Sequence, residues 1–197
     1  RLPRNIIARM QSLEYDRSFL AARILLDKIN ANMIISGAFG LFEKKTVIAV
    51  GGYDSSTMGE DMELVVRLHE FSRMNRKPYK IDFAQDAICW SQTPEKLSEL
   101  GKQRKRWQRG LFQCMWGHRK MLANPRYGAV GLLSYIYFLF YELLSPFIEL
   151  FGVLTMVLSV MMDMLNVKFM LAFLACYALY GILLTLTAYF SRIYTID

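Results

Sequence analysis

The stretch "MGEDMELVVRLHE", Met58 to Glu70, places three carboxylates directly after a glycine at the predicted start of a helix. The acids are Glu60, Asp61 and Glu63, in a chain whose formal net charge is +7. Acidic side chains in a first helical turn gain roughly 0.3–1 kcal/mol from the unpaired N–H groups, so a purely structural role is one explanation. The pattern predicts a helix that runs to about Met74, with the Glu63 side chain in solvent.

The segments around this helix predict an α/β fold. Apolar residues alternate with charged ones at helical spacing between about Met10 and Ile29, which is typical of an amphipathic helix. The run "NMIISGAFGLFEKK" is apolar and is interrupted by Gly37 and Gly40, so we expect a buried strand followed by a tight turn. Two further short runs, Tyr79–Phe83 and Ala87–Trp90, also have the composition of strands.

A second helix is predicted to begin at Thr93-Pro94 and to carry "LSELGKQRKRWQRG". At about 100° per residue, Gln103, Arg106 and Trp107 share one face of such a helix. The opposite face carries Lys102, Lys105 and Arg109, which are placed to meet water or anionic lipid headgroups. One interpretation of this cluster is a basic segment beside a membrane that only sets topology, and the other is a binding face built around Arg106.

The last third of the chain has a different composition. Residues 127–197 carry few charged side chains, and Phe169–Ser191 is a run of 23 residues without any. About 20 apolar residues cross the hydrocarbon core of a bilayer as a helix, so this run is predicted to span the membrane. The apolar run Val130–Met162 contains Pro146, which makes it one kinked span or two short pieces; we expect one kinked span.

Charge predicts how these spans are oriented. Residues 101–126 contain eight Lys or Arg and no acid, and the positive-inside rule places such a segment in the cytoplasm. Two crossings leave the turn Asp163–Lys168 outside and return Arg192 to the cytoplasm. We therefore expect a multi-pass protein of the cell membrane whose soluble part is cytoplasmic, and, because the chain begins without methionine, a fragment of a longer protein.

The cysteines and histidines indicate no metal site. Cys89, Cys114 and Cys176 show no C-x-x-C spacing and are predicted to be reduced, structural thiols. His69 and His118 are isolated in the sequence, and we expect structural or interfacial roles for both.

Three short motifs, in this order and followed by membrane spans, resemble a known family. They are "SGAF" at Ser36–Phe39, "GED" at Gly59–Asp61 and "QRKRW" at Gln103–Trp107. The chain resembles the C-terminal half of membrane-embedded family 2 glycosyltransferases, the group that contains bacterial cellulose, hyaluronan, chitin and poly-N-acetylglucosamine synthases. The resemblance implies an α/β, partial GT-A-like catalytic domain over residues 1–110, an amphipathic interface helix over 111–126 and a transmembrane region over 127–197.

The resemblance also implies roles for individual residues. Asp61 corresponds to the aspartate of the family's TED or GED motif, which is the catalytic base that takes a proton from the acceptor hydroxyl. Gln103 and Arg106 match the residues that contact the diphosphate of a nucleotide sugar, and Trp107 matches the residue on which the acceptor sugar stacks. The further substrate-binding candidates are Arg104, Glu60, Ser36 and Gly37. Glu60 has a second interpretation, as a simple first-turn charge.

The SGAF element departs from the cellulose-synthase pattern. Ser36 stands where that pattern has a cysteine and Ala38 where it has a serine, so sugar specificity does not carry over. The family's D-x-D motif, which binds a divalent metal (Mg²⁺ or Mn²⁺), does not occur in this sequence. We expect that motif and its metal in the longer protein, and we expect this chain alone to be inactive.

The sequence-based hypothesis is an inverting transferase that moves a sugar from a UDP-sugar to a growing polysaccharide and exports the polymer across the bilayer. One alternative is a non-processive membrane transferase that makes a glycolipid, and another is a non-catalytic membrane subunit. Export or regulatory subunits are possible partners, whereas nucleic acid is not expected because the basic cluster adjoins lipid. Glu142 and Glu149 either line the polymer path or pair with other helices.

Overall fold

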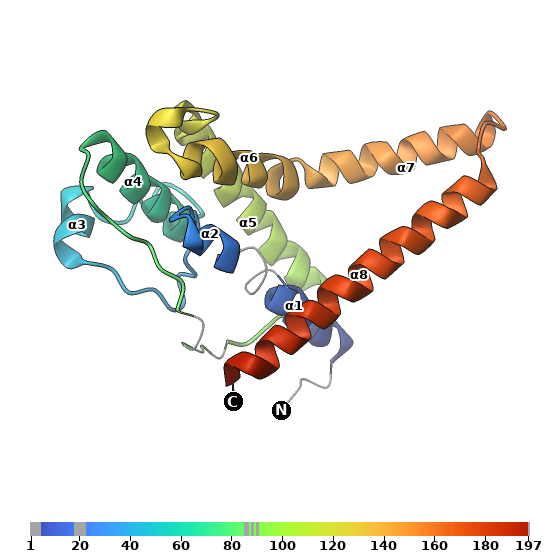
Figure 1. Cartoon of the computed structure of the whole chain (residues 1–197), viewed down its shortest axis with the longest axis horizontal. Helices are drawn as coiled ribbons and strands as arrows, with labels where there is room; N and C mark the ends of the chain where they lie inside the picture. Colours follow the sequence, from blue (N-terminus) through green and yellow to red (C-terminus); the bar gives the residue numbers. More distant parts are fainter. Residues whose placement is uncertain (1–4, 18–22, 85–86, 88, 90, 197) are drawn as a thin grey trace. The chain divides into compact units, whose positions relative to one another are not determined.

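The chain divides into two compact units, Arg1–Leu143 and Leu144–Asp197. The computed structural model describes residues 5–17, 23–84, 87, 89 and 91–196, and all regular structure in these ranges is helical (Figure 1). The longer helices of the first unit are α1 (Ile6–Arg17), α2 (Ile24–Lys28), α3 (Lys44–Ala49), α4 (Glu60–Met74) and α5 (Leu97–Gly117). They are followed by the 3₁₀ turns η2 (Arg119–Met121) and η3 (Pro125–Tyr127), the π-helical η4 (Val130–Ser134), α6 (Tyr135–Tyr137) and the π-helical η5 (Phe138–Leu143).

The hydrophobic core of the first unit forms where α4 packs against α5 and the segments that follow α5. In α4 three consecutive apolar residues are fully buried: Leu64, Val65 and Val66. Val66 belongs to the core cluster, and the other buried residues of that cluster come from the loop before α3, from α4, from α5 and from the segments that follow α5: Ala31, Met33, Met62, Cys114, Met115, Met121, Tyr127, Val130, Tyr135 and Phe138. This packing fixes α4 and α5, the two helices that carry the GED and QRKRW motifs.

The predicted strands are wrong for the residues that the structure describes. Residues 31–36 and 77–84 have no regular secondary structure, and Ala87–Trp90 lies partly outside the described ranges. Strands need a neighbouring strand to pair their backbone groups. Here side chains take that place, because Asn30 Oδ1 accepts from the Ile81 N–H at 2.9 Å and Asp27 Oδ1 accepts from the Phe83 N–H at 2.6 Å.

Three predicted helix boundaries can be compared with the structure. The helix predicted from the GED motif to Met74 is confirmed as α4. The amphipathic helix predicted over residues 10–29 corresponds to α1 and α2, with residues 18–22 outside the described part. The helix predicted from Thr93 begins later, at Leu97, because the carbonyl of Pro94 instead accepts a hydrogen bond from Gln11 Nε2 at 2.9 Å.

The interface helix predicted over residues 111–126 is not a separate helix. Residues 111–117 continue α5 without interruption, and the remainder contains η2 and η3. Two aromatic residues of this segment, Phe112 and Trp116, are exposed and stack on each other. A membrane-facing role for this segment, and the division at residues 110 and 126, stay predictions.

The second unit contains α7 (Ser145–Met161) and α8 (Val167–Ile196). In α8 the stretch Val167–Thr187 is long and apolar enough to cross a membrane, and residues 130–161 add a second span only if their two helical parts form one span. Pro146 lies in the first turn of α7, where its missing N–H leaves no hydrogen bond unmade. The proline therefore starts a new helix one residue after the boundary between the two units.

Candidate active site

Asp61, the predicted catalytic base, is half-buried in the first turn of α4. Its Oδ2 accepts a hydrogen bond from the Gly37 N–H at 3.0 Å, and its Oδ1 accepts one from the Met62 N–H at 2.8 Å. A Cβ atom at Gly37 would lie 3.2 Å from Asp61 Oδ2, so a glycine at this position lets the backbone approach the carboxylate. The structure thus brings the SGAF and GED motifs together, with Ser36 and Glu60 exposed beside them.

The GED turn lies directly against α5, through two glycines. A Cβ atom built at Gly110 would lie 2.7 Å from the backbone nitrogen of Gly59 and 2.8 Å from its Cα. Gln113, one turn further along α5, accepts a hydrogen bond through Oε1 from the Met58 N–H at 3.0 Å. This backbone contact fixes the start of α4, and with it Asp61, against α5.

The QRKRW side chains lie on α5, one to two turns before that contact. Because Arg106 and Gly110 are four residues apart and Gln103 and Gly110 are seven apart, all three lie on one side of the helix. Arg106 is exposed and makes no ion pair with any residue that the structure describes. Gln103 Oε1 is buried, and within the same described residues it has no hydrogen-bond partner. The exposed guanidinium of Arg106 is therefore available to a ligand, whereas Gln103 Oε1 is enclosed by the protein.

Arg104 differs from Arg106, because its guanidinium is already engaged. It donates two hydrogen bonds to the carboxylate of Glu14, at 2.8 and 2.5 Å, and lies 4.8 Å from the centre of the Trp107 ring. The Tyr15 ring lies 6.4 Å from the same indole, which is 40% exposed. Two residues of α1 thus hold the tryptophan face in place, a contact that no sequence motif indicates.

Arg23 is a further residue of this region that sequence reasoning missed. Burial lowers the pKa of its guanidinium to about 10, while the negative charges of Asp61 and Glu142 oppose that shift. Glu142 in turn interacts electrostatically with Glu14, Arg23 and Arg104. Glu142, which was predicted to line a polymer path or to pair with other helices, therefore interacts electrostatically with residues of the candidate site.

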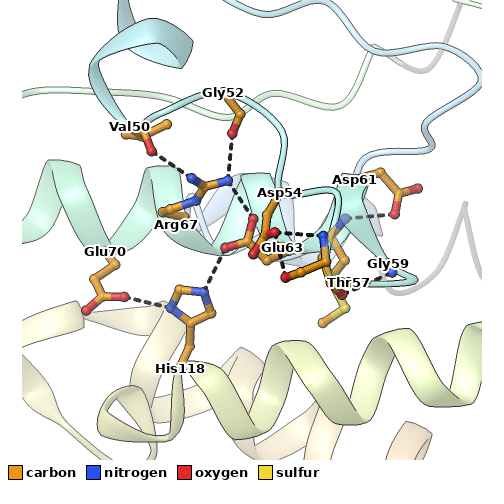
Figure 2. Close-up of polar contacts among 12 residues, drawn as sticks. Val50, Gly52, Asp54, Thr57, Gly59, Asp61, Glu63, Arg67, Glu70 and His118 are labelled. Atoms are coloured by element: carbon orange, nitrogen blue, oxygen red, sulfur yellow. Dashed lines mark hydrogen bonds and ion pairs between the residues drawn. The ribbon is translucent and has the colours of Figure 1, made fainter.

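Glu63 was expected in solvent, but this prediction is wrong: the residue is 8% exposed. Figure 2 shows its carboxylate between Arg67 and His118, at 2.6 Å from Arg67 Nη2 and 3.3 Å from His118 Nε2. Arg67 also donates to the carbonyls of Val50 and Gly52, each at 2.7 Å, and so holds the glycine turn that follows α3. Glu63 thus joins three segments of the first unit.

His118, at the end of α5, contacts two carboxylates of α4. Its Nδ1 lies 2.6 Å from Glu70 Oε2, and its Nε2 faces Glu63 (Figure 2). The structural role predicted for His118 is consistent with these contacts, which join the end of α5 to α4.

His69 is completely buried in α4 and is held neutral. Its Nε2 donates to the carbonyl of Asn32 and its Nδ1 accepts from the Tyr79 hydroxyl, both at 2.7 Å. Burial lowers the pKa of the imidazole to about 4. The structural role predicted for this histidine is consistent with these contacts.

His69 gives the fold a pH dependence. The unfolded chain binds a proton at this residue below about pH 6.5, whereas the folded chain does so only near pH 4, so unfolding is favoured as pH falls through that window. The free energy of unfolding is expected to drop by roughly 1.5 kcal/mol between about pH 6.5 and pH 5. Chemical denaturation of the wild type and of His69→Gln measures this, and equal slopes of stability against pH in the two proteins would contradict it.

The described residues do not form a site for a divalent metal by themselves. No group of three or more His, Cys, Asp or Glu side chains within those ranges is arranged to hold a metal ion. Asp61 and Glu63 have the spacing of a D-x-D motif, but their carboxylates contact different groups. Asp61 accepts from the Gly37 N–H and Glu63 pairs with Arg67. The metal predicted from the resemblance thus has no ligand set in this part of the chain.

Comparisons with known proteins agree with the motifs. The family model described as "Glycosyl transferase family group 2" matches residues 2–196. Poly-beta-1,6-N-acetyl-D-glucosamine synthase of Staphylococcus aureus strain COL is 32% identical over 120 residues, which cover 61% of this chain and 26% of that protein. The synthase of the same name from Staphylococcus epidermidis is 31% identical over the same length. No solved structure matches.

The aligned part of the chain thus covers about a quarter of the curated relatives that it matches. The family model, however, matches almost every residue of the chain, including those of the apolar helices α7 and α8. This chain belongs to the family 2 glycosyltransferases.

Proposed function

We propose that this chain is part of an inverting, membrane-bound transferase that lengthens a polysaccharide from a nucleotide-sugar donor, with Asp61 as its catalytic base. The observation that supports this most is the backbone contact between Gly59 and Gly110, which joins the carboxylate motif to the helix that carries Gln103 and Arg106. A base and an anion-binding group are thereby held on adjoining helices, as sugar transfer from a diphosphate donor requires.

The proposed reaction begins at the acceptor hydroxyl. The carboxylate of Asp61 takes the hydroxyl proton while the acceptor oxygen forms a bond to the anomeric carbon of the donor sugar. The bond between that carbon and the diphosphate oxygen breaks, and the nucleoside diphosphate leaves with the bonding electrons. The configuration at the anomeric carbon is inverted. The Gly37 and Met62 N–H groups hold the carboxylate in place for this step.

The nucleoside diphosphate that leaves in this step is expected to bind to the exposed face of α5. The guanidinium of Arg106, which forms no ion pair within the described ranges, can donate two parallel hydrogen bonds to phosphate oxygens, and the amide NH2 group of Gln103 can donate a third. Trp107, positioned by Arg104 and Tyr15, offers an apolar face to the acceptor sugar. The divalent metal, Mg²⁺ or Mn²⁺, is expected to be held by a D-x-D motif elsewhere in the longer protein.

Activity of the full-length gene product that contains this chain tests the proposal. Membranes that carry it are incubated with radiolabelled UDP-N-acetylglucosamine, chosen because the relatives are named as synthases of poly-N-acetylglucosamine, and with UDP-glucose. Incorporation into long, enzyme-digestible polymer supports the proposal. A labelled glycolipid with one sugar supports the non-processive alternative, and absence of any transfer points to the non-catalytic one.

Arg106→Lys separates the shape of the cation from its charge. Lysine keeps the charge but loses the planar fork, so we expect sugar transfer to fall about tenfold, with kcat reduced more than the affinity for the donor. Arg109→Lys, at an exposed arginine of α5 that lies outside the QRKRW motif, is the matched control and is expected to retain activity. Equal effects of the two substitutions would remove Arg106 from the diphosphate site.

A further inference from the structure

An open hollow of about 800 Å³ lies in the first unit, at the end of α4 opposite to Asp61. It is formed by the last turn of α4, the segment that follows it, Asn30 and one residue of η3. Nine residues line it: Asn30, Ser72, Arg73, Met74, Arg76, Lys77, Pro78, Tyr79 and Arg126. Four of these side chains are cationic and none is acidic, so the hollow is strongly positive.

Arg73, which is half-buried, is fixed in position by groups other than carboxylates within the described residues. Its Nε donates to the Tyr79 hydroxyl at 3.1 Å, and its guanidinium lies 5.4 Å from the centre of the same ring. A Cβ atom at Gly128 would lie 3.1 Å from Arg73 Cζ, so the guanidinium packs closely on that glycine. Tyr79 is itself held by His69 through a bond of 2.7 Å. The arginine is thus built into the structure and is not a loose surface side chain.

The other three cations, Arg76, Lys77 and Arg126, are exposed around Arg73. In the part of the chain that the structure describes, none of the four forms an ion pair with a carboxylate. The backbone of Arg76 has a φ of 50°, a conformation that glycine or asparagine adopts more easily than arginine. Like charges gathered in one hollow repel one another, and a bound anion removes that repulsion.

We propose that this hollow binds an anion that carries a phosphoryl group. Guanidinium groups match phosphate oxygens through paired hydrogen bonds, and a lysine adds a compact charge. The volume exceeds that of a single phosphate and suits a nucleotide or a lipid headgroup. Because Arg126 lies four residues before Val130, where the apolar helical run begins, a headgroup of an anionic lipid is within reach along the chain. The site is separate from Asp61 and does not depend on the proposed transfer reaction.

Two double variants of the full-length gene product, purified in detergent, test the proposal. Arg76→Glu with Lys77→Glu reverses two exposed charges of the hollow and leaves Arg73 and the fold in place. Lys44→Glu with Lys45→Glu makes the same change in net charge on α3, where both lysines are exposed. Binding of dioctanoyl phosphatidylglycerol, dioctanoyl phosphatidylcholine, UDP and inorganic phosphate is measured for each protein.

The hollow variant is expected to bind dioctanoyl phosphatidylglycerol at least about tenfold more weakly than the wild type, while the α3 variant stays within about twofold. Phosphatidylcholine, which has no net charge, is expected to bind all three proteins equally. A selective loss of UDP or phosphate binding instead supports the site with a soluble ligand. Equal loss in both double variants, or no loss in either with any of the four probes, overturns the proposal.

Discussion

Replacing Asp61 by asparagine in the full-length gene product is expected to lower sugar transfer at least about a hundredfold while binding of the nucleotide sugar is retained. Asparagine has nearly the same shape, and its single oxygen can still accept the hydrogen bond from the Gly37 N–H, although its NH2 group then replaces the oxygen that accepts from the Met62 N–H. What it lacks is the ability to take the proton of the acceptor hydroxyl. The loss should therefore appear in kcat and leave the fold intact.

Transfer of radiolabel from the UDP-sugar measures the rate, and calorimetric titration with UDP measures the binding that should persist. Asp82→Asn is the matched control, since Asp82 is an exposed aspartate whose ion-pair partner among the described residues is Lys80. Unchanged transfer by Asp61→Asn would remove this residue from the mechanism, and a parallel loss of UDP binding would indicate a role in holding the donor instead.

A methyl group at position 110 is expected to separate the two motifs. In Gly110→Ala the new Cβ would lie 2.7 Å from a backbone nitrogen of Gly59, which cannot rotate away as a side chain does. The helix and the GED turn must move apart, at a cost of about 1–3 kcal/mol in the free energy of unfolding. Because Asp61 is two residues from Gly59, sugar transfer should fall even in the fraction of protein that remains folded.

Gly101→Ala is a matched control on the same helix. Nothing lies within 4 Å of a Cβ at that position, and alanine in a helix interior is favoured over glycine by roughly 0.5–1 kcal/mol. We therefore expect opposite signs for the two substitutions when thermal unfolding is followed by circular dichroism. If Gly110→Ala proved as stable and as active as Gly101→Ala, the close contact between the motifs would not be needed for function.

Local patterns in the sequence predicted the parts of the fold that local forces determine. The bounds of α4 follow from a glycine, a run of acids in the first turn and apolar residues at helical spacing, all within 16 residues. The composition of the sequence likewise predicted the long apolar helix α8. Strands were predicted from short apolar runs, but whether such a run becomes a strand depends on a pairing partner that a single sequence does not reveal.

The details of the candidate site depend on contacts between distant residues. Glu63 looks like a solvated helix residue until His118, 55 positions later, is placed against it. Arg104 looks like a ligand-binding cation until Glu14, 90 positions earlier, occupies its guanidinium. Family resemblance pointed to Asp61, Gln103 and Arg106. Tyr15, Arg23 and Gly110 belong to no motif, and their part in this region is visible only once α1, the start of α2, α4 and α5 are packed together.

The double contact of His118 has a consequence for how this region tolerates insertions and deletions. Glu63 and Glu70 are seven residues apart, about two helical turns, and each faces one nitrogen of the same ring. Adding or deleting one residue between them would swing one carboxylate around the helix by about 100° and leave that nitrogen without it. Natural variants of this protein should therefore differ in residue identity along the exposed side of α4 but keep its length unchanged.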